Sequence, residues 1–277
     1  TPTTTIDADP DVNSYWPPTF PPTDPVRIVY FGDSITRGYG IRDQDVTYTE
    51  LLRTNADDAW PDWHGDDLDA RFGDLEVIDV SLDGATTDDV LDAELPDLED
   101  LLGPSVSGQT IVVGTIGGND ILDVAFSGDL DGGREHIEAN IAAIMRFFQD
   151  PVRFPDGTFI AMTNVYDPTD GVAQVNACFF GIDLGFLQPT FDRLNADTRQ
   201  HAVDNGWAWV DLHGHFIGHG FRYDEQGEWT DAADPTLWFQ RDCIHPNERG
   251  HHEVRRLFLA ALDGEPLAVV PPPVEGR

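Results

Sequence analysis

The serine in the stretch "GDSI" at residues 32–35 is a candidate nucleophile. It follows directly on an apolar, β-branched run at residues 28–31, in a chain that has only six serines. A serine at the end of a strand can instead cap a following helix, because its hydroxyl accepts hydrogen bonds from the first free amides. A serine nucleophile needs a base within hydrogen-bonding reach, and the base needs a group that orients it. Other residues must therefore decide between a cap and a nucleophile.

A base and a carboxylate that could orient it occur together in the stretch "RDCIHPNERG". Asp242 and His245 lie three residues apart, a spacing that can present both side chains on one side of a turn. Acyl transfer also needs hydrogen-bond donors for the developing oxyanion. Candidate donors are the backbone amides of Ser34 and Gly84 and the side-chain amide of Asn119, although Asn119 is also a candidate helix cap.

Five apolar runs alternate with longer helix-like stretches and indicate how these residues are positioned. We expect strands over residues 26–31, 75–80, 110–116, 158–163 and 207–212, and helices over about 86–102, 133–149, 189–205 and 247–262. This alternation is typical of a parallel sheet covered on both faces, so we predict one α/β domain with a mostly parallel, five-stranded sheet. Such sheets bind ligands at the carboxyl ends of their strands, which Ser34, residues 117–120 and Asn164 directly follow.

Four blocks of the sequence together resemble the GDSL or SGNH hydrolase family. They are residues 32–35, Gly84, residues 117–120 and residues 242–246, and they stand in the family's order over almost the whole chain. The resemblance implies a three-layer α/β/α sandwich with a flavodoxin-like sheet. It also implies a carboxylic ester hydrolase that works through an acyl-enzyme and needs no metal or cofactor.

The resemblance further implies a role for each candidate residue. Ser34 is then the nucleophile, His245 the base and Asp242 the carboxylate that orients the base. The oxyanion hole consists of the backbone amides of Ser34 and Gly84 and the side chain of Asn119. Because the base must be a neutral imidazole, we expect activity to fall on acidification.

The second block departs from the family pattern at two positions. The family commonly has Asn at the start of this block and Ser before its glycine, where this chain has Asp79 and Asp83. A carboxylate that pointed inward beside Gly84 would oppose a developing oxyanion. We therefore expect the side chain of Asp83 to face solvent.

The charge of the chain narrows the range of partners. Its 277 residues include 51 Asp and Glu against 16 basic residues, all arginine, for a net charge of −35. Phosphate binding needs a basic surface, so we expect no nucleic acid partner. No apolar run is long enough to span a bilayer, so we expect no membrane insertion. The charge is typical of a solubilising surface, and calcium binding by the acidic face is the alternative.

Histidines after the last predicted strand raise the question of zinc. His213, His215 and His219 lie close together, and His251 and His252 follow further on. Catalytic zinc needs three fixed ligands and an open position, whereas two of the first three histidines are followed by glycine in an expected loop. We therefore predict no metal site.

The two cysteines, Cys178 and Cys243, are far apart in sequence. As free thiols they would act as small buried apolar side chains. Because Cys243 lies in the turn with His245, and Cys178 in a long connection on the same side of the sheet, we hypothesise a disulfide that fixes this turn. Such a disulfide implies an extracytoplasmic setting of bacterial type, either secreted, periplasmic or surface-anchored.

The ends of the chain differ in composition from its centre. Residues 1–24 are rich in Pro, Thr and Asp and are interpreted as an arm or linker, and residues 266–277 as a Pro-rich tail. The hydrolase domain is then expected over residues 25–265.

Aromatic residues near the expected site hint at an apolar acyl pocket. They are Phe179, Phe180, Phe186, Trp238 and Phe239, any of which could instead belong to the core. With the acidic charge, they favour a small soluble ester with a short to medium acyl chain as the substrate. A lipase or lysophospholipase, a carbohydrate deacetylase, a non-catalytic binding module and a calcium-dependent surface-binding module remain alternatives.

Overall fold

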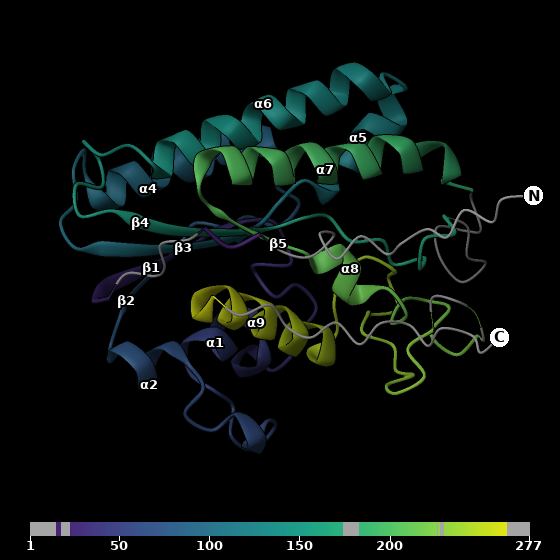
Figure 1. Ribbon diagram of the computed structural model, residues 1–277, viewed down its shortest axis with the longest axis horizontal. Helices are drawn as coiled ribbons and strands as arrows, with labels where there is room; N and C mark the ends of the chain where they lie inside the picture. The colour runs from purple at the N-terminus through teal and green to yellow at the C-terminus, as the bar shows by residue number, and fades with distance from the viewer. Residues whose placement is uncertain (1–14, 18–22, 174–182, 226, 228–229, 265–277) are drawn as a thin grey trace, which may run out of the picture.

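The computed structural model describes residues 15–17, 23–173, 183–225, 227 and 230–264, and within them the chain forms an all-parallel sheet (Figure 1). Its strands are β1 (Pro25–Gly32), β2 (Glu76–Asp79), β3 (Gln109–Thr115), β4 (Thr158–Thr163) and β5 (Ala208–Val210). Their spatial order is β2-β1-β3-β4-β5, the flavodoxin-like order. The predicted strands are confirmed, with ends that differ by at most two residues.

Helices cover both faces of the sheet and complete a three-layer α/β/α sandwich (Figure 1). One face carries α4 (Leu95–Leu102), α5 (Gly118–Ser127), α6 (Leu130–Phe148) and α7 (Gln188–Asn205). The other face carries α1 (Tyr48–Arg53), α2 (Leu68–Phe72) and α9 (Glu248–Asp263). The short helix α8 (Leu212–Phe216) follows β5. Along β1, Val29 and Phe31 enter the first core, whereas Ile28 and Tyr30 enter the second. Each strand thus contributes alternate side chains to two cores, as a sheet buried on both faces requires.

The long helices agree with the sequence-based expectation, and the short ones were not foreseen. The predicted helix over 86–102 is a composite of α3 (Thr87–Asp89), a π-helical turn η3 (Val90–Glu94) and α4. The unforeseen elements include α1, α2, α5 and α8, and the 3₁₀ turns η1 (Gln44–Val46), η2 (Pro61–Trp63) and η5 (Gly185–Leu187). Helices this short depend on tertiary packing more than on their own periodicity.

Glycine is required where β1 ends against β3. Gly32 has φ +113°, and a Cβ atom there would lie 2.0 Å from the carbonyl oxygen of Thr115. The next amide, that of Asp33, donates to the same oxygen at 3.0 Å. β1 and β3 are neighbours whose onward connections lead to opposite faces of the sheet, and ligand sites form at such switch points. Ser34 therefore leaves the sheet at the place where this fold offers a crevice.

A short part of the predicted N-terminal arm lies against the edge of the sheet. Tyr15 forms an antiparallel bridge with Trp209 of β5, with N–O distances of 2.9 and 3.0 Å. The bridge occupies backbone groups that an edge strand would otherwise expose. Most of the residues predicted as arm and tail lie outside the described residues, so the predicted domain boundaries stay predictions.

Candidate active site

Ser34 lies in a tight turn instead of a helix. Residues 34–40 form consecutive turns, in which the amide of Tyr39 donates to the carbonyl of Ser34 at 2.9 Å. The neighbouring Asp33 is buried, and its Oδ1 accepts hydrogen bonds from the amide of Ile35 at 3.0 Å and the hydroxyl of Thr115 at 2.9 Å. The cap of the Ile35 amide is therefore Asp33, and the hydroxyl of Ser34 has a different partner.

That partner is His245, carried by the loop before α9. The distance from Ser34 Oγ to His245 Nε2 is 2.8 Å, and His245 Nδ1 lies 2.8 Å from Asp242 Oδ2. The structure thus brings together three side chains that the sequence separates by up to 211 positions.

The turn that carries His245 is organised by the carboxylate of Asp242. Its Oδ1 accepts the backbone N–H groups of Ile244 and His245, both at 3.0 Å. Cys243, which lies between Asp242 and Ile244, has a left-handed φ of +64°. Partial burial acts to raise the pKa of Asp242, but these two N–H groups and the imidazole outweigh it and hold the pKa below its usual value. Asp242 is thus an anion at neutral pH. Because an anion accepts, Nδ1 of His245 carries the proton and Nε2 is left to accept from Ser34.

Two residues that sequence reasoning missed support the base. The ring of Tyr39 lies over the imidazole of His245, with centroids 4.6 Å apart and planes 36° apart. The side-chain amide of Gln240 donates to the carbonyls of Tyr39 at 2.7 Å and Pro246 at 2.9 Å. These bonds tie the loop of the serine to the loop of the histidine. Neither residue belongs to a recognisable motif, so only the fold reveals them.

The three predicted oxyanion donors lie in the same region but are not equivalent. Asn119 lies in the first turn of α5, borders the cavity beside Ser34, and donates through Nδ2 to the carbonyl of Ala85 at 2.9 Å. The helix is capped by Gly117, so Asn119 is not its cap. Gly84 adjoins Ala85 with φ +79°, is exposed, and does not border the cavity.

The acidic residue before Gly84 is exposed to solvent, as expected, and does not border the cavity beside Ser34. The carboxylate of Asp83 is about half exposed and lies 3.9 Å from the guanidinium of Arg37. Its charge is therefore directed to solvent and partly compensated.

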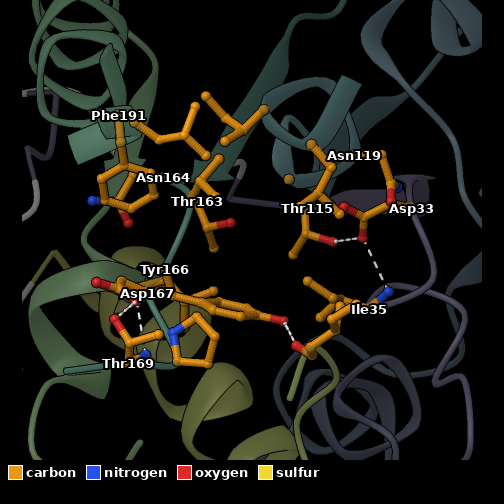
Figure 2. Close-up of a pocket in the computed structure, with 18 of the residues that line it drawn as sticks. Asp33, Ile35, Thr115, Asn119, Thr163, Asn164, Tyr166, Asp167, Thr169 and Phe191 are labelled. Carbon is orange, nitrogen blue, oxygen red and sulfur yellow. Dashed lines mark hydrogen bonds between the residues drawn. The ribbon is translucent and has the colours of Figure 1, made fainter. Parts of the chain in front are cut away.

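A largely apolar cavity of about 140 Å³ opens beside Ser34 (Figure 2). Its wall includes Ile121 and Leu122 of α5, Leu187 of η5 and Phe191 of α7. Figure 2 shows Asp33, Thr115 and Asn119 on one side of this cavity and Asn164 and Phe191 on the other. Tyr166, which also lines it, donates through its hydroxyl to the carbonyl of Ile244 and so links the cavity to the His245 turn.

Of the aromatic residues expected to form an acyl pocket, the three that the structure describes do not line this cavity. Trp238 and Phe239 are 3% and 2% exposed and pack in the core with Phe216, because their segment lies against α8 and α9. Phe186 is 53% exposed. Phe179 and Phe180 lie outside the described residues. The apolar character of the cavity agrees with the expectation, but the side chains that provide it come from α5, η5 and α7.

The histidines considered for zinc have other partners. His215 Nε2 lies 2.8 Å from Glu253 Oε2, His219 stacks on Trp238, and His251 Nδ1 accepts the amide of Tyr48 at 3.2 Å. The part of the chain that the structure describes contains no group of three or more His, Cys, Asp or Glu arranged to hold a metal ion.

The predicted disulfide involves one residue that the structure does not describe. Cys178 lies outside the described residues, and among those described there is no free cysteine. The Cys178–Cys243 pairing therefore stays a prediction. None of the described helices combines the length and apolarity needed to cross a membrane.

Comparisons with known proteins agree with this architecture. The model of the GDSL-like lipase/acylhydrolase family matches residues 30–253. No curated protein matches the chain.

Solved structures with similar folds include the α/β hydrolase LAE5 from the metagenome of Lake Arreo, with 21% identity over 87% of this chain and 96% of that one, at a TM-score of 0.55. An acetyl xylan esterase variant from Geobacillus stearothermophilus shares 16% identity over 88% and 97%, at a TM-score of 0.56. A lipolytic G-D-S-L family protein from Veillonella parvula shares 16% over 84% and 95%, at 0.52. At these identities the likeness is one of fold.

Proposed function

Since the chain belongs to the GDSL-like lipase/acylhydrolase family, we propose that it hydrolyses carboxylic esters through Ser34, His245 and Asp242. The observation that carries this proposal is the continuous hydrogen-bonded series from the serine hydroxyl through both ring nitrogens to an ionised carboxylate. A hydroxyl that donates to a neutral imidazole has its proton acceptor already in place.

In the acylation step, Ser34 Oγ attacks the ester carbonyl and its proton passes to His245 Nε2. The resulting imidazolium is stabilised by the negative charge of Asp242 at 2.8 Å. His245 then gives the proton to the departing alcohol as the carbon–oxygen bond breaks. In deacylation a water molecule repeats these steps, with His245 first accepting and then returning a proton to Ser34.

The oxyanion of each tetrahedral intermediate needs donors that are already oriented. In the proposed arrangement these are the backbone amides of Ser34 and Gly84 and the second N–H of the Asn119 side chain. The Asn119 amide is held by its bond to Ala85, so it loses little freedom when the oxyanion forms.

The apolar cavity is the proposed site of the acyl chain. Aliphatic side chains on its wall favour burial of a short to medium chain, since each buried methylene gains about 0.8 kcal/mol. The acidic surface disfavours adsorption to anionic lipid, so we propose small soluble esters as substrates, with no nucleic acid partner and no membrane insertion.

We also propose an extracytoplasmic setting, which rests on the predicted disulfide between Cys178 and Cys243. Alkylation of the denatured, unreduced protein tests its basis, because two labelled thiols would contradict the disulfide.

A panel of p-nitrophenyl esters of increasing acyl length, with the wild type and Ser34→Ala, tests the function. We expect kcat/KM to rise from acetate toward butyrate or hexanoate, and Ser34→Ala to lose at least about 10⁴-fold in kcat. A fluorophosphonate probe should label the wild type at Ser34 and leave Ser34→Ala unlabelled. A preference for acetate would favour carbohydrate deacetylation instead, and a wild type that is neither active nor labelled would indicate a binding module.

A further inference from the structure

A buried glutamate lies directly behind the turn of the serine. Glu94 ends the π-helical turn η3, is 0% exposed, and accepts the backbone N–H of Gly32 through Oε2 at 2.7 Å. π-Helical turns are rare and recur at functional sites. Nothing in the proposed mechanism uses this side chain.

The bond to Glu94 replaces one that the sheet does not supply. β2 ends at Asp79, yet the carbonyl of Gly32 still accepts the amide of Leu82 at 2.9 Å. The N–H of Gly32 turns to the side chain of Glu94. The next N–H, that of Asp33, donates in the opposite direction to Thr115 of β3. Two successive amides before Ser34 are thus anchored to two different elements, which fixes the direction in which Ser34 leaves the sheet.

The surroundings of Glu94 do not favour a negative charge. Its second oxygen, Oε1, is enclosed and has no hydrogen-bond partner among the described residues. The ionisable groups that act on it most are also acids, namely Asp33 in the turn after β1 and Asp79 in β2. Asp33 in turn faces Asp120 of α5. The backbone N–H groups of Gly32 and Leu82 favour the charged form of Glu94, but complete burial and the acidic neighbours outweigh them, so the neutral acid is the more stable form.

We propose that Glu94 is a positioning residue for the Ser34 turn, and that it holds the N–H of Gly32 as a neutral carboxylic acid while the enzyme is active. This inference rests on the proposed function of Ser34. An uncharged acid can anchor the turn without placing a negative charge near the oxyanion, whereas ionisation of Glu94 opposes the charge that develops there.

The expected protonation agrees with this arrangement. Burial, reinforced by the negative charge of Asp33, raises the pKa of Glu94 to about 8, although the N–H of Gly32 acts to lower it. Burial also raises the pKa of Asp33 to about 7, against the opposing bonds from Ile35 and Thr115. Because both values are raised, these acids are neutral on the acidic side and gain charge as the pH rises. The enzyme should therefore lose activity at alkaline pH.

Glu94→Gln separates charge from position, because an amide oxygen can still accept from Gly32 but cannot ionise. With p-nitrophenyl butyrate, we expect wild-type kcat to fall about tenfold above the pKa of Glu94, because negative charge then accumulates behind the Ser34 turn. Glu94→Gln should keep near-wild-type kcat at pH 7 and show a smaller alkaline fall than the wild type, because only Asp33 then gains charge in this range. An alkaline limb identical in both proteins, or a folded Glu94→Gln that is inactive at pH 7, would overturn the proposal.

Glu94→Leu removes the acceptor and tests the positioning role. We expect kcat to fall at every pH while KM changes little, because substrate contacts are unaltered. An unchanged kcat would contradict the role. Glu135→Gln, the same chemical change at an exposed position on α6, is the matched control and should leave kcat and the pH profile unchanged.

A measurement on the wild type decides the matter if the variants do not fold. Infrared difference spectra should lose the carbonyl stretch of protonated carboxylic acids in two steps, near pH 7 for Asp33 and near pH 8 for Glu94, and the absence of the second step would refute a neutral Glu94. Failure of the proposed function is distinguishable, since the wild type would then neither hydrolyse the ester nor react with a fluorophosphonate at Ser34. If the wild type reacts but Glu94→Gln leaves the alkaline fall in kcat unchanged, only the inference about Glu94 is contradicted.

Discussion

The two sides of Ser34 hold their carboxyl groups in opposite states. On the base side, Asp242 is partly exposed and accepts two backbone N–H groups and the imidazole, and its pKa is lowered. On the sheet side, Glu94 is completely buried, lies among other acids and accepts the N–H of Gly32, and its pKa is raised. The difference shows that the number of donors and access to solvent, more than residue type, decide where charge resides. In the proposed mechanism, a fixed anion thus lies beside the imidazole that takes up a proton, and neutral acids lie behind the turn of the nucleophile.

We expect the largest loss of activity when the negative charge of Asp242 beside His245 is removed. Asp242→Asn replaces it with an amide that can donate to Nδ1, which favours the tautomer with the proton on Nε2. Ser34 then loses its acceptor, and we expect kcat to fall by about 10⁴-fold, the loss typical of this change in a serine triad. The exposed Asp224→Asn is the control, and steady-state kinetics with p-nitrophenyl butyrate is the measurement. A folded Asp242→Asn enzyme with more than a tenth of wild-type kcat would show that the charge is dispensable.

A second change addresses the opposite side, where negative charge develops during the reaction. Asn119→Ala removes a donor that borders the cavity, and we expect a loss of about 10²–10³-fold in kcat with little change in KM. The exposed Asn205→Ala, near the end of α7, is the control. A loss confined to KM would instead assign Asn119 to substrate binding.

The pH dependence of folding stability tests the protonation state of Glu94 without any substrate. The pKa of Glu94 rises from 4.5 to about 8 on folding, so the folded state holds a proton that the unfolded state releases in this interval. The stability from this group is complete below the lower value and is lost as the pH rises through the upper one. Thermal melts should therefore show Glu94→Gln gaining Tm relative to wild type between pH 5 and pH 9. A constant difference between the two proteins across this range would argue against a raised pKa.

The smallest expected effect concerns the ring that covers the base. Tyr39 lies over His245 and is 51% exposed, so its contact with the imidazolium is worth about 0.5–1 kcal/mol. Tyr39→Leu should lower kcat by about two- to fivefold, and Tyr39→Phe should retain wild-type kcat because the ring is kept. Equal losses in the two variants would point to the hydroxyl instead of the ring.

The sequence allowed the sheet to be predicted because its strands are short apolar runs, each ended by polar residues or glycine. It also indicated the Ser34, Asp242 and His245 set, since turn residues with functional side chains stand out at strand ends and around a proline. Glu94 could not be found in this way. It belongs to the acidic stretch "DDVLDAELPDLED", in which no local pattern distinguishes a completely buried carboxyl from those exposed to solvent.

The residues that line the cavity were hard to identify from the sequence for a related reason. Trp238 and Phe239 are near the Asp242 turn in sequence but point into the core, whereas Phe191, far from every motif, borders the cavity. Proximity along the chain is a poor guide to proximity in space when helices deliver the wall. The helix α5 was not predicted because it is too short to show a clear helical pattern, although it supplies both Asn119 and part of that wall.

The bridge between Tyr15 and Trp209 has a practical consequence for anyone who shortens the chain. A version that starts at residue 23, the first residue of the long described stretch, looks complete by sequence and retains every motif. It would uncover the outer backbone of β5, a free hydrogen-bonding edge that invites a second molecule to add a strand. Loss of solubility in such a truncated protein would then reflect the exposed edge of β5, and not a change in the arrangement of Ser34, Asp242 and His245.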